Sequence, residues 1–267
     1  MEGLLRWCRK KLKRGWRSAT GERREEVRPG EPANRPVTKA GWEFGRAQDA
    51  KPVRRKDSEY IADIKASIDQ QKWQGLRDHW FENDSHGFNH PYIKYFDVDR
   101  WLPQAVSLSR RLGLMDGGRK RVFDIGCGSG LFGYTCKYLG HDIVGLDIGN
   151  PMFMAMCEAL GVPVVVDFVV RHKPLPAELT GFDVVTSISA KFHVGEIVEG
   201  KAQQYVWDDG DWDYFLADVK SRLNPGGVYL FRFKRMFMLP PGLLERMARA
   251  RELSPGTYVF TRDELPG

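Results

Sequence analysis

The sequence contains few cysteines and no long apolar run. Its 267 residues include four cysteines, and no two of them have the C-x-x-C spacing that is typical of iron–sulfur and redox sites. No stretch approaches the roughly 18 apolar residues of a membrane-spanning helix, and the first residues lack the apolar core of a secretory signal. We therefore expect a cytoplasmic protein whose cysteines are reduced thiols.

The net charge of +6 lies in the first 17 residues. Residues 1–17 hold seven Lys or Arg side chains against one Glu, so residues 18–267 sum to zero, and nucleic acid is not expected as a partner. On a helix over residues 3–17 the basic side chains surround one apolar face, formed by Leu4, Leu5, Cys8, Leu12 and Trp16. Such a helix would make peripheral contact with an anionic membrane. A solvated tail and an Arg-rich transit peptide are the alternatives.

Composition divides the chain into three parts. Residues 1–57 are rich in charge, Gly and Pro, and they predict a basic, largely disordered extension. Residues 58–118 predict helices, because isoleucine recurs at helical spacing from Ile61 to Ile68, and these helices would form a lid or substrate-binding region. Residues 119–267 alternate strands and helices, which predicts an α/β core.

An aromatic and histidine-rich stretch covers residues 80–101. It includes Tyr92 and Tyr95, and it supports two hypotheses: the stretch is a lid over a ligand site, or its rings only pack against the core. His86 and His90 lie next to a glycine and a proline and do not share a helix face. We therefore expect no metal site from this pair.

From Arg119 onward the pattern predicts a doubly wound α/β fold. Short apolar runs that are typical of strands alternate with amphipathic helices. Because the order is strand, helix, strand, we expect a mostly parallel sheet of at least five strands with flanking helices. The expected strands are residues 121–125, 143–147, 162–168, 182–188 and 228–233.

A glycine-rich turn follows the first expected strand. Glycines let the backbone turn tightly and approach a ligand where a Cβ would clash. The order is Asp124-Ile-Gly126-Cys127-Gly128-Ser-Gly130, which resembles the first motif of class I S-adenosylmethionine-dependent methyltransferases, D/E-x-G-x-G-x-G. The resemblance covers residues 119–234. It implies that S-adenosyl-L-methionine is the cofactor, that the numbered residues of this motif bind it, and that the aspartate lies near its α-amino group.

The same glycines also fit a dinucleotide-binding fingerprint. Gly128-x-Gly130-x-x-Gly133 matches its spacing, and Asp147 follows Gly128 by nineteen residues. Three features favour the methyltransferase: Asp124 before the glycines, an Asn-Pro-Gly-Gly turn into the fifth expected strand, and Phe-Asp-Val-Val in the fourth. An NAD- or flavin-dependent oxidoreductase remains the weaker alternative.

The resemblance assigns roles to residues beyond the glycine-rich turn. It implies that Asp147 holds both ribose hydroxyls of the cofactor, since a carboxylate offers two acceptor oxygens, and that Ile148 lines one face of the adenine. Asp167 would accept a hydrogen bond from the adenine amino group, and Phe168 would supply apolar cover. Ser187, at the end of the fourth expected strand, would face the methyl sulfonium.

The implied reaction is in-line displacement of the methyl group by a hydroxyl or amine, and it requires alignment more than a base. No Asn/Asp-Pro-Pro-aromatic motif follows the fourth expected strand, which favours a small-molecule or glycan-like acceptor over nucleic acid. His193 is the candidate base, with an exposed loop histidine as the alternative. We expect Tyr92, Tyr95, His193 and Trp207 to line the acceptor pocket, with the last two supplied by a loop over residues 189–210.

After the fifth strand, members of this family normally add a helix and an antiparallel hairpin. Here Thr261-Arg-Asp-Glu264 has the pattern of a capping box, and the sequence given ends at Gly267. We therefore expect an incomplete hairpin, in which the final strands are missing or residues 256–261 and N-terminal residues substitute. This motivates a second alternative, an inactive scaffold that binds S-adenosylmethionine without chemistry.

Overall fold

The structure is a computed structural model that describes residues 55–83, 92–199, 201–233 and 238–267. The chain divides into two units, residues 1–46 and 47–267, and the description below concerns the second. The expected amphipathic helix over residues 3–17 and the pair His86 and His90 lie outside the described residues. In the described ranges, no helix combines the length and the apolar character needed to cross a membrane.

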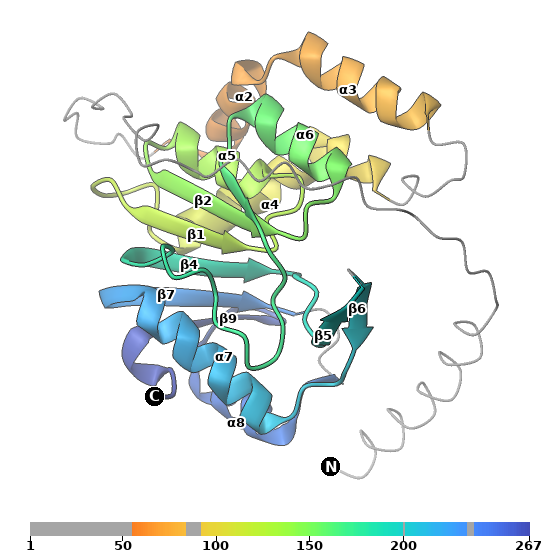
Figure 1. Ribbon diagram of the computed structural model, residues 1–267. Coiled ribbons are helices and arrows are strands. Elements are labelled where there is room, and N and C mark those ends of the chain that lie inside the picture. Colours follow the sequence, from red (N-terminus) through yellow and green to blue (C-terminus); the bar gives the residue numbers. More distant parts are fainter. Residues whose placement is uncertain (1–54, 84–91, 200, 234–237) are drawn as a thin grey trace, which may run out of the picture. The chain divides into compact units, whose positions relative to one another are not determined.

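A seven-stranded sheet forms the centre of this unit (Figure 1). The strand order is β3-β2-β1-β4-β7-β9-β8, and the first five strands are parallel to their neighbours. These five are β1 (Arg121–Ile125), β2 (Asp142–Asp147), β3 (Val164–Val166), β4 (Phe182–Ile188) and β7 (Leu223–Arg232). The expected fold class, a doubly wound and mostly parallel α/β sheet, is confirmed.

The antiparallel hairpin at the C-terminal edge is present: residues 257–261 supply a strand, as one of the two expected alternatives had it, but their outer partner is residues 251–254 and not an N-terminal segment. β9 (Thr257–Thr261) lies antiparallel to β7, and β8 (Arg251–Ser254) pairs with β9. Gly256 makes the turn between them at φ +76°, a conformation that glycine adopts without strain. The capping box of Thr261 and Glu264 is present, but it begins one short 3-10 turn (η5, Arg262–Glu264) rather than a helix.

Helices cover both faces of the sheet, and strand side chains alternate between two cores. Val122, Val184 and Leu230 face one core, whereas Phe123 and Val185 face the other. The first core is covered by α2 (Asp57–Ser67), α3 (Gln70–Glu82), η3 (Ile93–Phe96), α4 (Val98–Arg111), α5 (Leu131–Tyr138) and α6 (Pro151–Leu160). The second is covered by α7 (Asp209–Arg222) and α8 (Pro241–Arg249) (Figure 1).

A small second sheet lies between β4 and α7, where the sequence predicted a loop over residues 189–210. It is an antiparallel hairpin of β5 (Val194–Val198) and β6 (Lys201–Gln204). Its alternation of apolar and polar residues is short, so the pattern gave little sign of strands. The hairpin matters for the site because it determines where His193 and Trp207 lie.

Candidate active site

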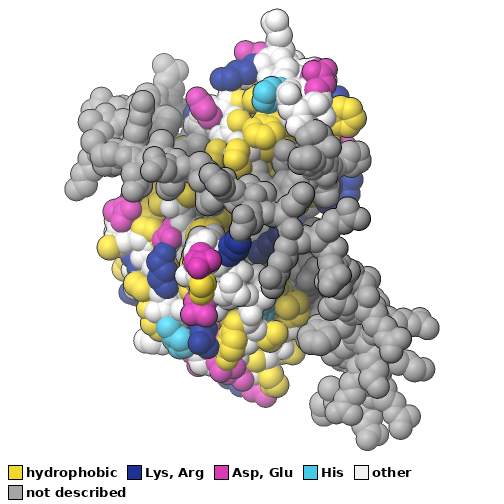
Figure 2. Space-filling view, turned by 45° about the vertical axis from the view of Figure 1, so that its right-hand side comes forward, with side chains coloured by type: hydrophobic (Ala, Val, Ile, Leu, Met, Phe, Trp, Pro, Cys, Tyr) yellow, Lys and Arg dark blue, Asp and Glu magenta, His cyan; other side chains and the backbone are white. Residues whose placement is uncertain are grey.

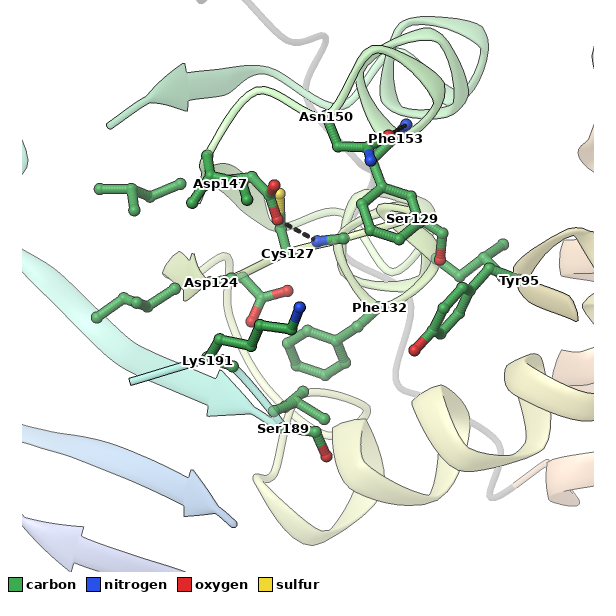
Figure 3. A pocket seen from close by; sticks show the side chains of 18 of the residues that line it. Tyr95, Asp124, Cys127, Ser129, Phe132, Asp147, Asn150, Phe153, Ser189 and Lys191 are labelled. Atoms are coloured by element: carbon green, nitrogen blue, oxygen red, sulfur yellow. Dashed lines mark hydrogen bonds between the residues drawn. The ribbon is translucent and has the colours of Figure 1, made fainter. Parts of the chain in front are cut away.

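A cavity of about 270 Å³ opens where the parallel strands end (Figure 3). Its walls come from the turn after β1, the ends of β2 and β4, the last residue of β7, and the η3–α4 and α6 helices. In open α/β sheets, ligands bind outside the carboxyl ends of the strands, where the order of connections reverses. β1 and β4 flank that position here, so the cavity lies where the fold predicts a site.

The glycine-rich turn forms the floor of the cavity. The amides of Gly126 and Cys127 both donate to the carbonyl of Leu146 on β2, at 2.7 and 3.2 Å. A Cβ on Gly126 would lie 2.6 Å from the Cβ of Ala190, and its φ is +74°. A Cβ on Gly128 would meet nothing nearer than 3.9 Å. The first glycine is therefore required by packing, whereas the second keeps open a space inside the cavity.

Asp124 presents a buried carboxylate at the end of β1. Its side chain is 2% exposed and accepts a hydrogen bond from the hydroxyl of Thr186 on β4, at 2.6 Å. Burial raises the pKa of Asp124 to about 7; the Thr186 hydrogen bond lowers it, and the charge of Asp147 raises it further. A cationic group in the cavity would stabilise the ionised form, so the carboxylate is suited to an ammonium ligand.

Asp147 ends β2 on the same wall of the cavity. Its Oδ2 accepts the amide N–H of Gly128 at 2.9 Å, which ties the glycine-rich turn to the second strand (Figure 3). Burial raises the pKa of Asp147, while the backbone amides of Gly128, Ile148 and Gly149 and the charge of Lys191 lower it. Because Asp147 also lines the cavity, its carboxylate oxygens can accept hydrogen bonds from a ligand there.

The segment after β3 contributes one further acid. Asp167 lines the cavity, accepts the amide N–H of Phe168 at 2.7 Å and forms an ion pair with Lys173. Ile148 also lines the cavity and is half exposed. Phe168 is not among the lining residues, so the expected apolar cover from this side chain is missing from the wall.

An aromatic wall closes one side of the cavity. Tyr95 stacks on Trp101 with ring centroids 5.0 Å apart, and Phe153 of α6 meets the edges of Tyr92 and Tyr95 at 5.6 and 5.4 Å. All four rings line the cavity. The described residues 92–101 of the aromatic stretch therefore supply three of these rings to the wall, and Trp101, which was not among the expected pocket residues, is one of them.

Four other expected contacts are placed differently by the structure. Gly130 and Ser187 do not line the cavity, although their neighbours in sequence do. Gly130 instead makes room for Cys157, whose sulfur would lie 2.8 Å from a Cβ there. Ser187 is fully buried in β4. His193 and Trp207 do not line the cavity either, which corrects the expected acceptor pocket.

His193 and Trp207 belong to an aromatic core cluster under α7. Trp207 is 1% exposed, and its indole N–H donates to the carbonyl of Val194 at 3.1 Å. The Nδ1 of His193 accepts the amide N–H of Trp207 at 2.9 Å, and its ring meets the edges of Trp212 and Phe233. Burial lowers the pKa of His193. This histidine is a core residue, neither a base lining the cavity nor the exposed loop histidine that was the alternative.

The cavity also contains polar residues that the sequence analysis missed. Lys191 and Ser189 follow β4, Arg232 ends β7, and Gln104 projects from α4. Their positions just beyond strands four and five could have identified the first three, because those strand ends share the cavity edge. Gln104 had no such signal, since only the packing of α4 brings it there.

The remaining chemistry of the described residues is limited. Cys127, Cys136 and Cys157 are buried free thiols, and burial raises the pKa of Cys136 above its ordinary value. Within the described ranges, no group of three or more His, Cys, Asp or Glu side chains could hold a metal ion. The cavity therefore offers carboxylates, backbone amides, aromatic faces and two cations as its functional groups.

Comparison with known proteins gives a family match for the part of the chain that runs from β1 to β7. Residues 123–231 match the family described as "Methyltransferase domain". A ubiquinone biosynthesis O-methyltransferase from Paraburkholderia phymatum is 32% identical over 148 residues, which are 51% of this chain and 61% of the relative. Another, from Photobacterium profundum, is 35% identical over 78 residues, or 28% of this chain and 33% of the relative. The chain thus spans less than two thirds of either relative.

Solved structures give weaker likenesses. A TehB-like SAM-dependent methyltransferase from Corynebacterium glutamicum has a TM-score of 0.40 and 18% identity, covering 64% of this chain and 96% of that one. An amino pentose methyltransferase from Micromonospora echinaspora has a TM-score of 0.36 and 22% identity, covering 49% and 50%. Likenesses at this level support no substrate and no partner.

Proposed function

Because residues 123–231 form a class I S-adenosylmethionine-dependent methyltransferase domain, we propose that this chain transfers a methyl group to a hydroxyl or amine of a small-molecule or glycan-like acceptor. A hydroxyl is favoured, since the curated relatives are named O-methyltransferases. The observation that carries the proposal is one cavity in which Asp124, the glycine-rich turn and Asp147 meet an aromatic wall.

The donor set of the cavity suits the parts of S-adenosylmethionine. Asp124, buried beside Thr186, would accept from the α-ammonium group. Asp147 would accept from the ribose hydroxyls while it retains the amide of Gly128. Asp167 would accept from the adenine amino group, and the exposed Ile148 would cover an adenine face. The space beside Gly128, which a Cβ would fill, leaves room for the methionine and ribose portion of the cofactor.

Bound S-adenosylmethionine supplies a methyl group that its sulfonium charge has already activated. The chain's task is to hold the acceptor atom in line with that methyl group at near-attack distance, roughly 3 Å. In such a transfer the acceptor lone pair would form the new bond to carbon as the carbon–sulfur bond breaks, the electron pair of the broken bond would stay on sulfur, and the acceptor's proton would pass to solvent. His193 has no part in this step, because it does not line the cavity.

The observations that favoured the two alternatives, an inactive scaffold and an oxidoreductase, no longer support them. The scaffold hypothesis rested on a missing C-terminal hairpin, and β8 and β9 supply that hairpin. The oxidoreductase hypothesis rested on the glycine spacing and on Asp147 nineteen residues after Gly128. A dinucleotide fold of that type has a sheet order of 3-2-1-4-5-6, whereas here an antiparallel strand, β9, lies between β7 and β8.

Calorimetry tests cofactor binding before any acceptor is known. We expect S-adenosylhomocysteine to bind the chain at micromolar concentration and NAD not to bind. Asp147→Ala should lose roughly 1.5–3 kcal/mol of binding free energy, about tenfold or more in Kd, because hydrogen bonds to a charged acceptor are lost. Asp116→Ala removes an exposed carboxylate outside the cavity and serves as the control. Equal affinity of parent and Asp147→Ala would remove the ribose assignment.

A labelled-methyl assay tests the chemistry. The chain is incubated with methyl-labelled S-adenosylmethionine and fractionated small-molecule pools, and transfer into a low-molecular-weight fraction is expected. The Asp147→Ala variant should lose this transfer in proportion to its weaker cofactor binding. Labelling confined to nucleic acid would contradict the proposed acceptor class while leaving the cofactor site intact.

A further inference from the structure

The charges that line the cavity are divided between its two halves. Asp124, Asp147 and Asp167 come from the β1–β2–β3 side, whereas Lys191 and Arg232 follow β4 and end β7. Figure 2 shows basic and acidic side chains next to each other near the centre of the described surface. The proposed cofactor carries two cationic groups and one carboxylate, so the acidic half suits it. The basic half suits an anion, which is either the carboxylate of the cofactor or a group of the acceptor.

The two cations differ in what offsets them. Figure 3 shows the Lys191 amino group directed toward the carboxylate of Asp124, and its charge lowers the pKa of Asp147. The acidic half therefore offsets part of the charge of Lys191, although no carboxylate among the described residues forms an ion pair with it. Arg232 has no such arrangement: across the described part of the chain, no carboxylate forms an ion pair with it, and its recorded side-chain partner is the Gln104 amide oxygen, at 3.4 Å.

Backbone pairing holds Arg232 at the edge of the cavity. It is the last residue of β7, it lies opposite Ile188 of β4, and its carbonyl accepts the amide N–H of Ser189 at 2.9 Å. The side chain is half-buried. A half-buried guanidinium without a carboxylate partner is suited to bind an anion, because its planar donors match carboxylate and phosphate oxygens.

This guanidinium adjoins the aromatic wall. Gln104, its partner, lies on α4 three residues after Trp101, and residues three apart share a helix face. Tyr95 stacks on Trp101. The three residues Arg232, Gln104 and Trp101 all line the cavity. A flat ligand against this wall would therefore bring a substituent at its rim within reach of Arg232.

The position of β7 separates this subsite from the proposed cofactor residues. β4 lies between β1 and β7, and two strand spacings amount to about 10 Å. We propose, on the basis of the proposed function, that the methyl acceptor is a flat molecule with an anionic carboxylate or phosphate group, and that Arg232 binds this group while the aromatic wall holds the ring.

A matched pair of probes tests the charge preference. In calorimetry with the S-adenosylhomocysteine-loaded protein, 3,4-dihydroxybenzoate is compared with the uncharged 3,4-dihydroxybenzamide. We expect the anion to bind about tenfold more tightly, as for hydrogen bonds between charged groups. Arg232→Gln should abolish this preference, and Arg232→Lys should retain part of it. Arg251→Gln removes the same charge from the exposed edge strand β8 and should change nothing.

The carboxylate of the cofactor is the competing ligand for Arg232, and a second comparison separates the two. The parent and Arg232→Gln are titrated with S-adenosylhomocysteine and with 5′-methylthioadenosine, which lacks the amino acid portion. We expect both ligands to bind the variant as they bind the parent. A loss confined to S-adenosylhomocysteine would assign Arg232 to the cofactor and overturn the proposal.

Two other outcomes also decide the matter. Equal affinity of the two benzoate-type probes for the loaded parent protein, including no binding of either at millimolar concentration, overturns the anionic acceptor. Failure of the parent protein to bind S-adenosylhomocysteine would instead contradict the proposed function itself. The cofactor titration precedes the probe titration, so the two failures are distinguishable.

Discussion

Two segments of this chain both carry aromatic side chains and have different roles. Residues 92–101 place Tyr92, Tyr95 and Trp101 on the wall of the cavity. Residues 192–207 bury Phe192, His193 and Trp207 in the core between the sheet and α7. Both segments combine aromatic rings with polar tips, so their side chains would serve either role. The neighbours that cover each segment make the difference.

The covering elements explain the separation. Trp207 directly precedes α7 and packs against Trp212 and Phe215 of that helix, which excludes water from the ring. Tyr95 belongs to the 3-10 helix η3 and Tyr92 is its N-cap, and both rings meet Phe153 of α6. One aromatic segment therefore stabilises the fold, and the other is available for a ligand.

The largest expected effect comes from Trp207→Ala. Removal of a fully buried indole with its hydrogen bond to Val194 should lower the free energy of unfolding by roughly 3–5 kcal/mol. The affinity of the folded fraction for S-adenosylhomocysteine should not change. Urea unfolding and calorimetry below the transition measure the two quantities. A large loss of affinity with little loss of stability would move Trp207 to the cavity and end the distinction between the segments.

A pair of glycine substitutions tests how the 189–191 loop reaches the cavity. Gly126→Ala and Gly128→Ala both introduce a left-handed non-glycine residue, which costs about 1–2 kcal/mol. Only Gly126→Ala adds a contact with Ala190, so it should be the less stable variant in urea. Folded Gly128→Ala should bind S-adenosylhomocysteine more weakly than the parent does, by more than its loss of stability accounts for. Equal unfolding free energies of the two variants would show that the 189–191 loop moves away from the added methyl group without loss of stability.

Tyr95→Leu tests the aromatic wall. Loss of its stacking on Trp101 and of its edge contact with Phe153 should weaken binding of 3,4-dihydroxybenzoate by roughly 0.5–1.5 kcal/mol, or severalfold in Kd. Affinity for S-adenosylhomocysteine should stay within error. Tyr214→Leu, on the partly exposed surface of α7, is the matched control. Unchanged probe binding in Tyr95→Leu would mean that the wall is only packing.

The smallest expected effect is the pH dependence of stability at His193. Its pKa is lowered by burial in the folded state, so the unfolded chain binds more protons below about pH 6.5, and the contribution of the neutral ring is lost as pH falls through that range. His193→Asn keeps an acceptor for the Trp207 amide. The variant should therefore be more destabilised relative to the parent at pH 7 than at pH 5.

The comparison with the parent is necessary because other groups titrate in the same range. The pKa of Asp124 is raised to about 7, so this carboxyl favours the folded state as pH falls, opposite to His193. Urea unfolding of parent and His193→Asn at both pH values cancels the Asp124 contribution. If the difference in unfolding free energy between the parent and His193→Asn is the same at pH 5 and pH 7, the His193 ring remains hydrated in the folded state.

Strand periodicity led to the two acids that the structure brings together in the cavity, and their roles toward a cofactor are part of the proposed function. Asp124 and Asp147 end two apolar strands, and parallel strands end at one edge, so their meeting in one cavity followed from local pattern. The match of residues 123–231 to a methyltransferase domain confirms the resemblance on which the cofactor rested. Ser187 lies inside β4 and Phe168 follows β3, yet neither of them lines the cavity. An offset of one residue along a strand turns a side chain to the opposite face, and the hydrophobic pattern of the sequence does not locate strand ends to within one residue.

The amino-acid sequence by itself determined the periodicity of the parallel strands, the glycine-rich turn and the acids that follow it, because these depend on neighbouring residues in the chain. Only the tertiary structure decided that His193 is buried, that Trp101 joins the wall and that Gln104 meets Arg232. The last pair is separated by more than a hundred residues. Such contacts depend on how helices pack across the sheet, and that packing is a property of the whole core rather than of any segment.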